Sequence, residues 1–343
     1  MSQTLQLDQF YLIAQGHAAF QLLWAGTQFN LFSKLHEKDG MTINEIQEAI
    51  GTQFQPTRIL VVGLTALGLL EKKNDRYYNS EIADNLLRKE APGNLLAVLG
   101  WQHHIVYPGL IDFVESLKTH KNAGLERFPG TENTLYERLA HTPAIEKVFQ
   151  DAMSSLSTHS NKLLLDAISL EGVKHIVDVG GGDATNTIAF AQKFDQLKLT
   201  VFDSESVCII AEKNIEKAGL SHRINTHVGN LFDTEFPTGI DAILYSHMFT
   251  IYSPEKNIEI LRKTYQALPT NGIVIIFNMM GNDNDDGPIS TALGSPYFLA
   301  IATGEGMLYS WSDYEKWLAE AGFKAVKRGN LESLNHGYFI GTK

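Results

Sequence analysis

The sequence is poor in cysteine, in positive charge and in long apolar runs, and each shortage excludes a class of protein. The single cysteine, Cys208, rules out an intramolecular disulfide and a cysteine-based metal cluster, and it predicts a reducing, cytoplasmic compartment. Lysine and arginine number 28 against 39 acidic residues, for a formal net charge of −11. This balance disfavours a general affinity for nucleic acid or anionic membranes, because phosphate binding needs clustered basic side chains.

The chain also lacks the sequence features of membrane insertion and of secretion. No apolar run reaches the roughly 18–20 residues of a membrane span. The opening segment MSQTLQLDQF has no basic region followed by an apolar one, so it does not match a secretion signal. We therefore expect a cytoplasmic protein without nucleic-acid or membrane partners.

The first part of the chain has the pattern of a winged-helix domain. Residues 9–35 place apolar side chains at helical intervals around more than one face, so this segment must be buried in a core or against a partner chain. Thr42 followed by Glu45 is a capping-box pattern that begins a short helix. A second helix follows, and LLEKKNDRYYNS predicts a two-stranded wing. Because the second helix offers one basic residue, Arg58, to a DNA groove, we expect residues 1–95 to form a dimerisation domain rather than to read DNA.

Two further regions follow this domain. Residues 96–168 are mostly helical, with a break at Pro129-Gly130. Over residues 169–343, short β-branched strands alternate with helices, which is typical of a parallel, doubly wound α/β sheet of the Rossmann-like class. The five strand candidates are HIVDVG, LTVFD, INTHVGN, AILYSH and GIVIIFN.

A glycine-rich turn, VDVGGGDAT at residues 177–185, joins the first of these strands to a helix. Glycines let the backbone approach a ligand closely and adopt positive φ, and the helix N-terminus adds positive potential. A dinucleotide fingerprint would need glycine where Thr185 stands, and it would place Asp183 against a pyrophosphate. The cationic sulfonium and ammonium groups of S-adenosylmethionine (SAM) instead favour a nearby carboxylate such as Asp178. The turn therefore indicates SAM rather than a nicotinamide cofactor.

The ends of the next two strands carry side chains suited to the rest of this cofactor. Asp203 ends the second strand about 20 residues after the glycines, where its carboxylate can accept both ribose hydroxyls. Asn230 and Phe232 follow the third strand, where an amide can meet adenine N6 and a ring can stack on the base. We expect the cofactor to contact Asp178, Gly180, Gly182, Asp203, Asn230, Leu231, Phe232, Ser246 and His247.

The whole chain resembles the plant-type and antibiotic-pathway small-molecule O-methyltransferases, in which a winged-helix dimerisation domain precedes a SAM-dependent Rossmann-like domain. The resemblance rests on the N-terminal winged helix, VDVGGG, Asp203, GNLF, residues 245–255 and YSWSDYEKWLAEAGF. GNLF stands where the family usually has GDMF, so Asn230 replaces an aspartate. The resemblance implies a homodimer that interlocks through the N-terminal segment, and an acceptor pocket lined by helices from residues 100–160.

The catalytic histidine of that family is missing. The family sequence after the fourth strand is close to x-H-V-L-H-D-W-x-D-E, and SHMFTIYSPE places Thr250 at the catalytic position. The two acidic partners of the family's histidine correspond to Asn278 and a position near Leu308. A threonine hydroxyl loses its proton only at very high pH, so Thr250 cannot serve as a base. His247 could accept a proton near pH 7, but it matches the first, variable histidine position, for which packing or cofactor contact is the more usual role.

Methyl transfer without a base favours an acceptor whose lone pair or π electrons are already available, because positioning alone then lowers the barrier. A thioether fits best, since its methylation needs no deprotonation. The first expectation is therefore S-methylation of a compound such as 4-methylthio-2-hydroxybutyrate, as in relatives that synthesise dimethylsulfoniopropionate. Three alternatives stay open: O-, N- or C-methylation of an aromatic or 2-oxo acid metabolite, a non-methylating hydroxylase or pericyclase, and a SAM-binding regulator.

Aromatic and polar-tipped side chains at helical spacing are candidates for the acceptor site, although the same spacing is typical of a core. The candidates are Trp101, His104, Tyr107, Tyr136, Phe149, Met153, Tyr297, Tyr309 and Trp311. Arg127 and Arg138 could pair with an acidic acceptor or lie on solvated helix faces. No H-x₃-H or HExxH arrangement is present, so we expect no metal.

Overall fold

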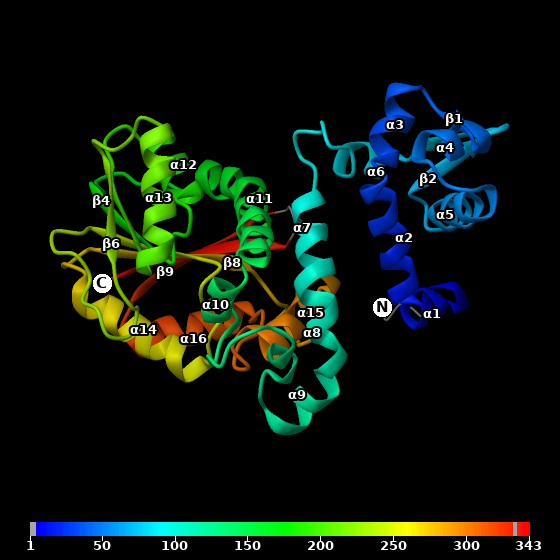
Figure 1. Ribbon diagram of the computed structural model, residues 1–343. Coiled ribbons are helices and arrows are strands. Elements are labelled where there is room, and N and C mark those ends of the chain that lie inside the picture. Colours follow the sequence, from blue (N-terminus) through cyan, green and yellow to red (C-terminus); the bar gives the residue numbers. More distant parts are fainter. Residues whose placement is uncertain (1–4, 332–334) are drawn as a thin grey trace. The chain divides into compact units, whose positions relative to one another are not determined.

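The computed structural model describes residues 5–331 and 335–343, and the chain forms two compact units (Figure 1). The first unit ends at His103 and the second begins at His104. Each unit has hydrophobic core residues of its own, as expected for separate domains. Within the described residues, no helix is both long and apolar enough to cross a bilayer.

The first unit is helical with a small antiparallel sheet, and it has the predicted winged-helix pattern. Its elements are α1 (Leu7–Ala14), α2 (Gly16–Gln28), α3 (Leu31–Glu37), β1 (Met41–Thr42), α4 (Ile43–Ile50), α5 (Phe54–Ala66), β2 (Leu70–Lys73), β3 (Arg76–Asn79), α6 (Glu81–Leu86) and α7 (Leu96–Trp101). Thr42 caps α4 by accepting from the backbone N–H of Glu45, whose carboxylate accepts from the N–H of Thr42. The wing is the β2–β3 hairpin, and the strand order is β1-β3-β2.

The apolar segment predicted over residues 9–35 is divided among three helices. The chain turns at Asn30, whose φ of 51° lies in the left-handed region and cannot continue a right-handed helix. After this turn α3 buries Leu31 and Phe32. In contrast, α1 contains no buried residue, and it exposes Phe10 and Ile13 among other apolar side chains. The burial required by the sequence pattern is therefore met for α3 within the unit, whereas α1 presents an apolar surface to its surroundings.

Several short helices and then the long helix α11 lead from the unit boundary to the sheet of the second unit. They are η1 (Gln102–Val106), α8 (Tyr107–Gly109), η2 (Leu110–Asp112), α9 (Phe113–Thr119), η3 (Ala123–Arg127), α10 (Leu135–Arg138), η4 (Leu139–His141) and α11 (Pro143–Ala167). The predicted break at Pro129-Gly130 falls between η3 and α10, where Gly130 has a φ of 124°. The side chain of Arg138 stabilises this break by donating to the carbonyl groups of Leu125, Phe128 and Glu132.

The sheet of the second unit has seven strands in the order β6-β5-β4-β7-β8-β10-β9. The strands are β4 (His175–Val179), β5 (Lys198–Asp203), β6 (Ile224–Val228), β7 (Ala242–Ser246), β8 (Ile273–Met279), β9 (Ala325–Leu331) and β10 (His336–Thr342). The five predicted strands are confirmed and are parallel. Two further strands complete the mostly parallel sheet, in which β10 is antiparallel to β8 and β9. The sequence of β9 gave little signal, since it is a mostly exposed edge strand without apolar alternation.

Helices cover both faces of this sheet, with α11, α12 (Thr185–Lys193) and α13 (Glu205–Lys217) on one face (Figure 1). The other face carries α14 (Pro254–Ala267) and α16 (Trp311–Ala321), and α15 (Ile289–Tyr297) follows β8. The carboxyl ends of the five parallel strands share one edge. The strand order reverses between β4 and β7, and ligands of open α/β sheets bind at such a point.

Candidate active site

The predicted glycine turn lies at this edge, directly after β4. Gly180 and Gly182 have φ values of 67° and 58°, in the left-handed region that favours glycine. A side-chain Cβ at Gly180 would also lie 2.2 Å from the sulfur of Met248, so a larger residue there would have to displace that side chain. Residues 180–182 therefore offer a backbone without side chains, as the close approach of a ligand requires.

Two carboxylates lie beside the turn. Asp203 accepts from the N–H of Gly182 at 3.0 Å and from the N–H of Ser204 at 2.7 Å. Asp178 is 1% exposed and accepts from the hydroxyl of Thr187 at 2.7 Å, while its Oδ1 atom is buried without a hydrogen-bond partner among the described residues. Burial raises the pKa of Asp178 to about 7 against the opposing hydrogen bond from Thr187, and the charge of Asp203 adds to the rise. A buried carboxylate oxygen without a donor fits a cationic ligand, which would stabilise the ionised form.

The residues after β6 form the third part of the predicted cofactor site. The Oδ1 atom of Asn230 accepts from the N–H of Phe232 at 2.9 Å. The ring of Phe232 is 36% exposed and meets Tyr252 edge-on, with 5.2 Å between the ring centroids. Leu231 is 7% exposed and packs in the core, so a cofactor contact at this residue would come from its backbone. The ring is exposed beyond this strand end, and its stacking on a base remains a prediction.

The side chain of His247 turns toward β8 and β10. Its Nε2 atom lies 3.0 Å from the Nε2 atom of His336, and its Nδ1 atom lies 3.1 Å from the hydroxyl of Ser246. The ring also meets Phe277 edge-on. Burial lowers the pKa of His247 to about 3, and the neighbouring His336 contributes to the decrease. The imidazole is therefore neutral at pH 7 and is a poor proton acceptor, which agrees with packing or cofactor contact rather than base catalysis.

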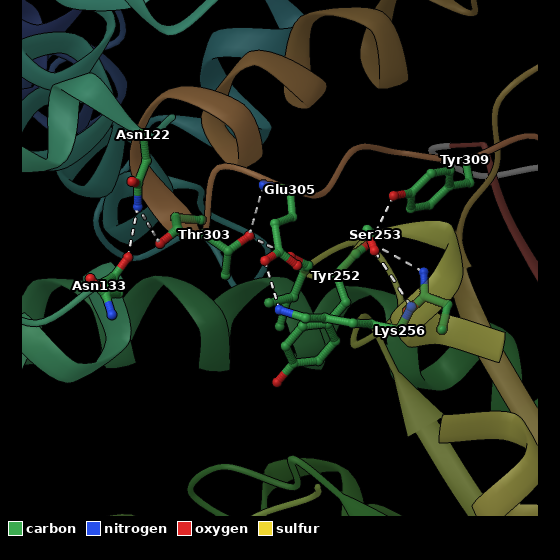
Figure 2. A network of polar contacts seen from close by, with 11 residues as sticks. Asn122, Asn133, Tyr252, Ser253, Lys256, Thr303, Glu305 and Tyr309 are labelled. Carbon is green, nitrogen blue, oxygen red and sulfur yellow. Dashed lines mark hydrogen bonds and ion pairs between the residues drawn. The ribbon is translucent and has the colours of Figure 1, made fainter. Parts of the chain in front are cut away.

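The loop that carries Thr250 is held by side chains that donate to its carbonyl groups, and Figure 2 shows two of these donors, Thr303 and Tyr309. The donor–acceptor pairs are Thr250 to His247, Asn257 to Phe249, Thr303 to Ile251, and Tyr309 to Tyr252. Thr250 is 1% exposed, and its hydroxyl lies 3.0 Å from the carbonyl oxygen that it binds. The hydroxyl at the family's catalytic position therefore stabilises its own loop.

The two positions that accompany the catalytic histidine in the family also lack an acid. Asn278 is 1% exposed, and its amide group donates to the hydroxyl of Tyr314 at 3.1 Å. Leu308 is 8% exposed, and its Cδ1 atom lies close to Gly294. No side chain at positions 250, 278 and 308 can therefore accept a proton near neutral pH.

Two of the predicted acceptor residues are in direct contact. Tyr136 on α10 meets Phe149 on α11 edge-on, with 5.8 Å between the ring centroids. Met153 follows Phe149 by one helical turn on α11. Tyr252 lies in the loop itself, where its ring meets Phe232 edge-on. Sequence reasoning missed Tyr252, although the motif alignment places it at the family's tryptophan.

The remaining acceptor candidates lie elsewhere. Tyr309 packs against Trp317 and Trp311 packs against Phe339, so both rings belong to the core region of the second unit. Tyr107 is 36% exposed, and Trp101 belongs to the first unit. That these four residues contact an acceptor remains a prediction.

A cavity of about 290 Å³ lies beside α10 and α11. Its volume is just below the range of about 300–1,000 Å³ that is usual for small-molecule sites. Its lining includes His104, Arg127, Leu135, Arg138, Leu139 and Ile145. The two guanidinium groups already face Asp112 and Glu126. Of the predicted acceptor residues, His104 is among those that line this cavity.

Comparison with known proteins identifies the family. Residues 110–324 match the O-methyltransferase domain, and residues 11–89 match the O-methyltransferase dimerisation domain. The chain is 38% identical to the L-tyrosine C(3)-methyltransferase of Streptomyces lavendulae, over 99% of this chain and 93% of that protein. It is 30% identical to the 3-hydroxy-5-methyl-1-naphthoate 3-O-methyltransferase of Streptomyces sahachiroi, over 96% and 94% of the two chains.

A solved structure agrees with these relatives. The apo form of the S-adenosylmethionine-dependent methyltransferase SibL has a TM-score of 0.87 and 37% identity, with 98% of this chain and 99% of that chain covered. The chain therefore belongs to the O-methyltransferase family and is a SAM-dependent methyltransferase.

The residues at the sheet edge fit this cofactor. The unpartnered oxygen of Asp178 suits a cation, Asp203 offers two carboxylate oxygens, and the ring of Phe232 is accessible. Bound SAM supplies an activated methyl group. Among the residues that the structure describes, no three histidine, cysteine or acidic side chains are grouped to hold a metal ion.

Proposed function

We propose that this enzyme methylates a ring carbon next to the hydroxyl group of a phenol, with L-tyrosine as the first candidate acceptor. The observation that carries this proposal is the replacement of the catalytic acid–base set by Thr250, Asn278 and Leu308, all of which are buried. The similarity to an L-tyrosine C(3)-methyltransferase supports the same reaction.

Carbon methylation suits a site without a base at the family's catalytic position. A phenol oxygen must lose its proton to become a good nucleophile, and a base beside the methyl group assists O-methylation for that reason. A ring carbon next to the hydroxyl carries π electron density and needs no proton removed before it attacks. Its proton leaves after the new bond has formed, so water can accept it. The enzyme then has to hold the ring carbon in line with the methyl group, which is a matter of positioning.

A thioether acceptor, the first expectation from the sequence, satisfies the same requirement and is the second candidate. Its support is the missing base alone, whereas the phenol has the added support of the relative. The two acceptors give products that differ in charge. A methylated thioether carries a permanent positive charge, and a ring-methylated phenol carries none.

We also propose that the enzyme is a homodimer that associates through its first unit. The match of residues 11–89 to a dimerisation domain supports this assembly. So does α1, which exposes Leu7, Phe10, Tyr11, Leu12 and Ile13. Such a surface is typical of a protein interface. Sedimentation velocity should show a dimer, and a monomer at micromolar concentration would contradict it.

The test of the reaction is a product analysis with purified enzyme and SAM. The acceptors are L-tyrosine deuterated at both ring positions next to the hydroxyl, a naphthol carboxylate and 4-methylthio-2-hydroxybutyrate. Carbon methylation of the deuterated tyrosine should give a product that has gained one methyl group and lost one deuterium. Retention of both deuterium atoms would indicate O-methylation. A sulfonium product from the thioether, with none from either phenol, would overturn the proposal.

A further inference from the structure

The long helix α11 carries an asparagine at a position where its own pattern favours an apolar side chain. Leu164 and Leu165 lie on the buried face of α11, and position 161 belongs to the same face because it precedes them by three and four residues. Asn161 is 4% exposed. Among the described residues it is the one amide whose Oδ1 and Nδ2 atoms are both buried without a hydrogen-bond partner.

An amide of this kind destabilises the fold. A buried polar group without a partner loses its hydrogen bonds to water and gains none in exchange, so native structures contain few such groups. A leucine at position 161 would continue the apolar face without this loss. Departures of a sequence from its own local pattern are expected at functional sites. The amide of Asn161 therefore indicates a contact with a ligand.

Asn161 lines a groove of about 370 Å³ between α11 and α12, which pack side by side on one face of the sheet (Figure 1). At one end of the groove the hydroxyl groups of Ser154 and Thr185 lie 3.0 Å apart. At the other end Lys193 and Asp166 form an ion pair. The volume lies within the range of about 300–1,000 Å³ that is usual for small-molecule sites.

This groove is separate from the cofactor and acceptor residues described above. None of the residues predicted to contact SAM lines it, and neither does any predicted acceptor residue. Thr185 is the first residue of α12, and its hydroxyl donates to the carboxylate of Asp183 in the glycine turn at 2.6 Å. The groove therefore begins where the glycine turn ends, and it follows α12 away from the turn.

The lining indicates the chemistry of the ligand. Leu165, Ile188 and Ala189 give the groove an apolar surface suited to a small flat molecule. An asparagine amide has two N–H donors beside a carbonyl acceptor, so it pairs best with a group that also presents a donor and an acceptor side by side. Both polar atoms of Asn161 are covered, and a ligand reaches them when exposed, flexible side chains such as Lys162 move aside.

We propose that the groove between α11 and α12 binds a small planar molecule with adjacent N–H and carbonyl groups, as in a carboxamide, a lactam or the edge of a nucleobase. The carbonyl of this ligand accepts from Nδ2 of Asn161, and its N–H group donates to Oδ1. The groove is thus a second binding site, and its existence does not depend on which atom the enzyme methylates.

The first test compares the stability of two variants by thermal unfolding of the enzyme without ligand. Asn161→Leu removes the unpartnered amide, so the variant should unfold at the wild-type temperature or above it. Asn257→Leu is the matched control, because Asn257 is fully buried but donates to the carbonyl groups of Phe249 and Tyr252. The control should unfold about 4 °C or more below the wild type. An equal decrease in Asn161→Leu would mean that the amide stabilises the fold, and the proposal would be wrong.

The second test measures binding by NMR titration with S-adenosylhomocysteine present to fill the cofactor site. Uracil and nicotinamide are the probes, and 1,3-dimethyluracil, which has no N–H group, is the matched control compound. The intact enzyme should bind at least one probe, with an affinity at least tenfold higher than that for 1,3-dimethyluracil. The affinity for that probe should fall at least tenfold in Asn161→Leu and also in Asn161→Ala, which adds no bulk to the groove. If neither probe binds, or if both variants bind the probes as tightly as the intact enzyme, the proposed site is wrong and the proposed methylation reaction stands.

Discussion

The cofactor half and the acceptor half of this site are built in different ways. The cofactor half depends on strand ends and on backbone geometry, with Gly180 in a left-handed conformation and Asp203 accepting from the N–H of Gly182 in the glycine turn. The acceptor half that we propose depends instead on side chains from separate helices, such as Tyr136 on α10 and Phe149 on α11. The first half can be shared by enzymes of this fold whatever they methylate. The second half, by contrast, decides which atom receives the methyl group.

The largest effect on the cofactor half is expected when the carboxylate of Asp203 is removed. Asp203→Ala removes the acceptor predicted for both ribose hydroxyls. Two hydrogen bonds to a charged group are together worth about 3 kcal/mol or more, so the affinity for SAM should fall about 100-fold or more. Titration calorimetry measures the change. Asp203→Asn, which keeps the shape and loses the charge, should retain part of the affinity. An unchanged dissociation constant in Asp203→Ala would refute the assignment.

Asp178 provides a second test of the cofactor half. Burial of its charged carboxylate destabilises the folded apoprotein, and bound cofactor should offset that destabilisation. Its pKa in the folded protein is about 7, above the ordinary value of an aspartate, so the folded state holds the proton to higher pH than the unfolded chain. The stability that this protonation gives is complete at low pH and is lost as the pH rises toward 7. Asp178→Asn retains an acceptor for Thr187 and removes the titration.

For Asp178→Asn we expect opposite effects on stability and on binding. The apoprotein should unfold at a temperature a few degrees higher than the wild type at pH 8, with less difference at pH 5. The affinity for SAM should fall roughly tenfold, because a charge-assisted contact is worth about 1.5 kcal/mol. Thermal unfolding at both pH values, with and without SAM, measures both effects. A variant that is less stable at pH 8 and binds SAM normally would contradict this account.

The same division explains what could be predicted from the sequence. The glycine turn, the acid after the second strand and the five parallel strands each have a local signal, and the structure places them as expected. The contact between the rings of Phe232 and Tyr252 has none, because the two residues follow different strands and only packing brings them together. The left-handed turn at Asn30 and the exposed strand β9 were not predicted, for a related reason. Both depend on what surrounds the segment rather than on its own apolar pattern.

The smallest expected effect tests the idea that no proton moves at the family's catalytic position. Thr250→Val keeps the volume and removes a hydroxyl that donates only to the carbonyl of His247. The lost hydrogen bond should cost about 1 kcal/mol of unfolding free energy, whereas turnover should change less than threefold. Thr250→Ser keeps the donor and is the matched control for the loss of stability.

Single-turnover rates measured from pH 6 to pH 9 complete the comparison, since the variant and the wild type should follow the same profile. A thousandfold loss of rate in Thr250→Val that Thr250→Ser restores would mean that the hydroxyl acts on the reacting atoms, and the acceptor half would then contain a catalytic group at the position where we infer only a structural one.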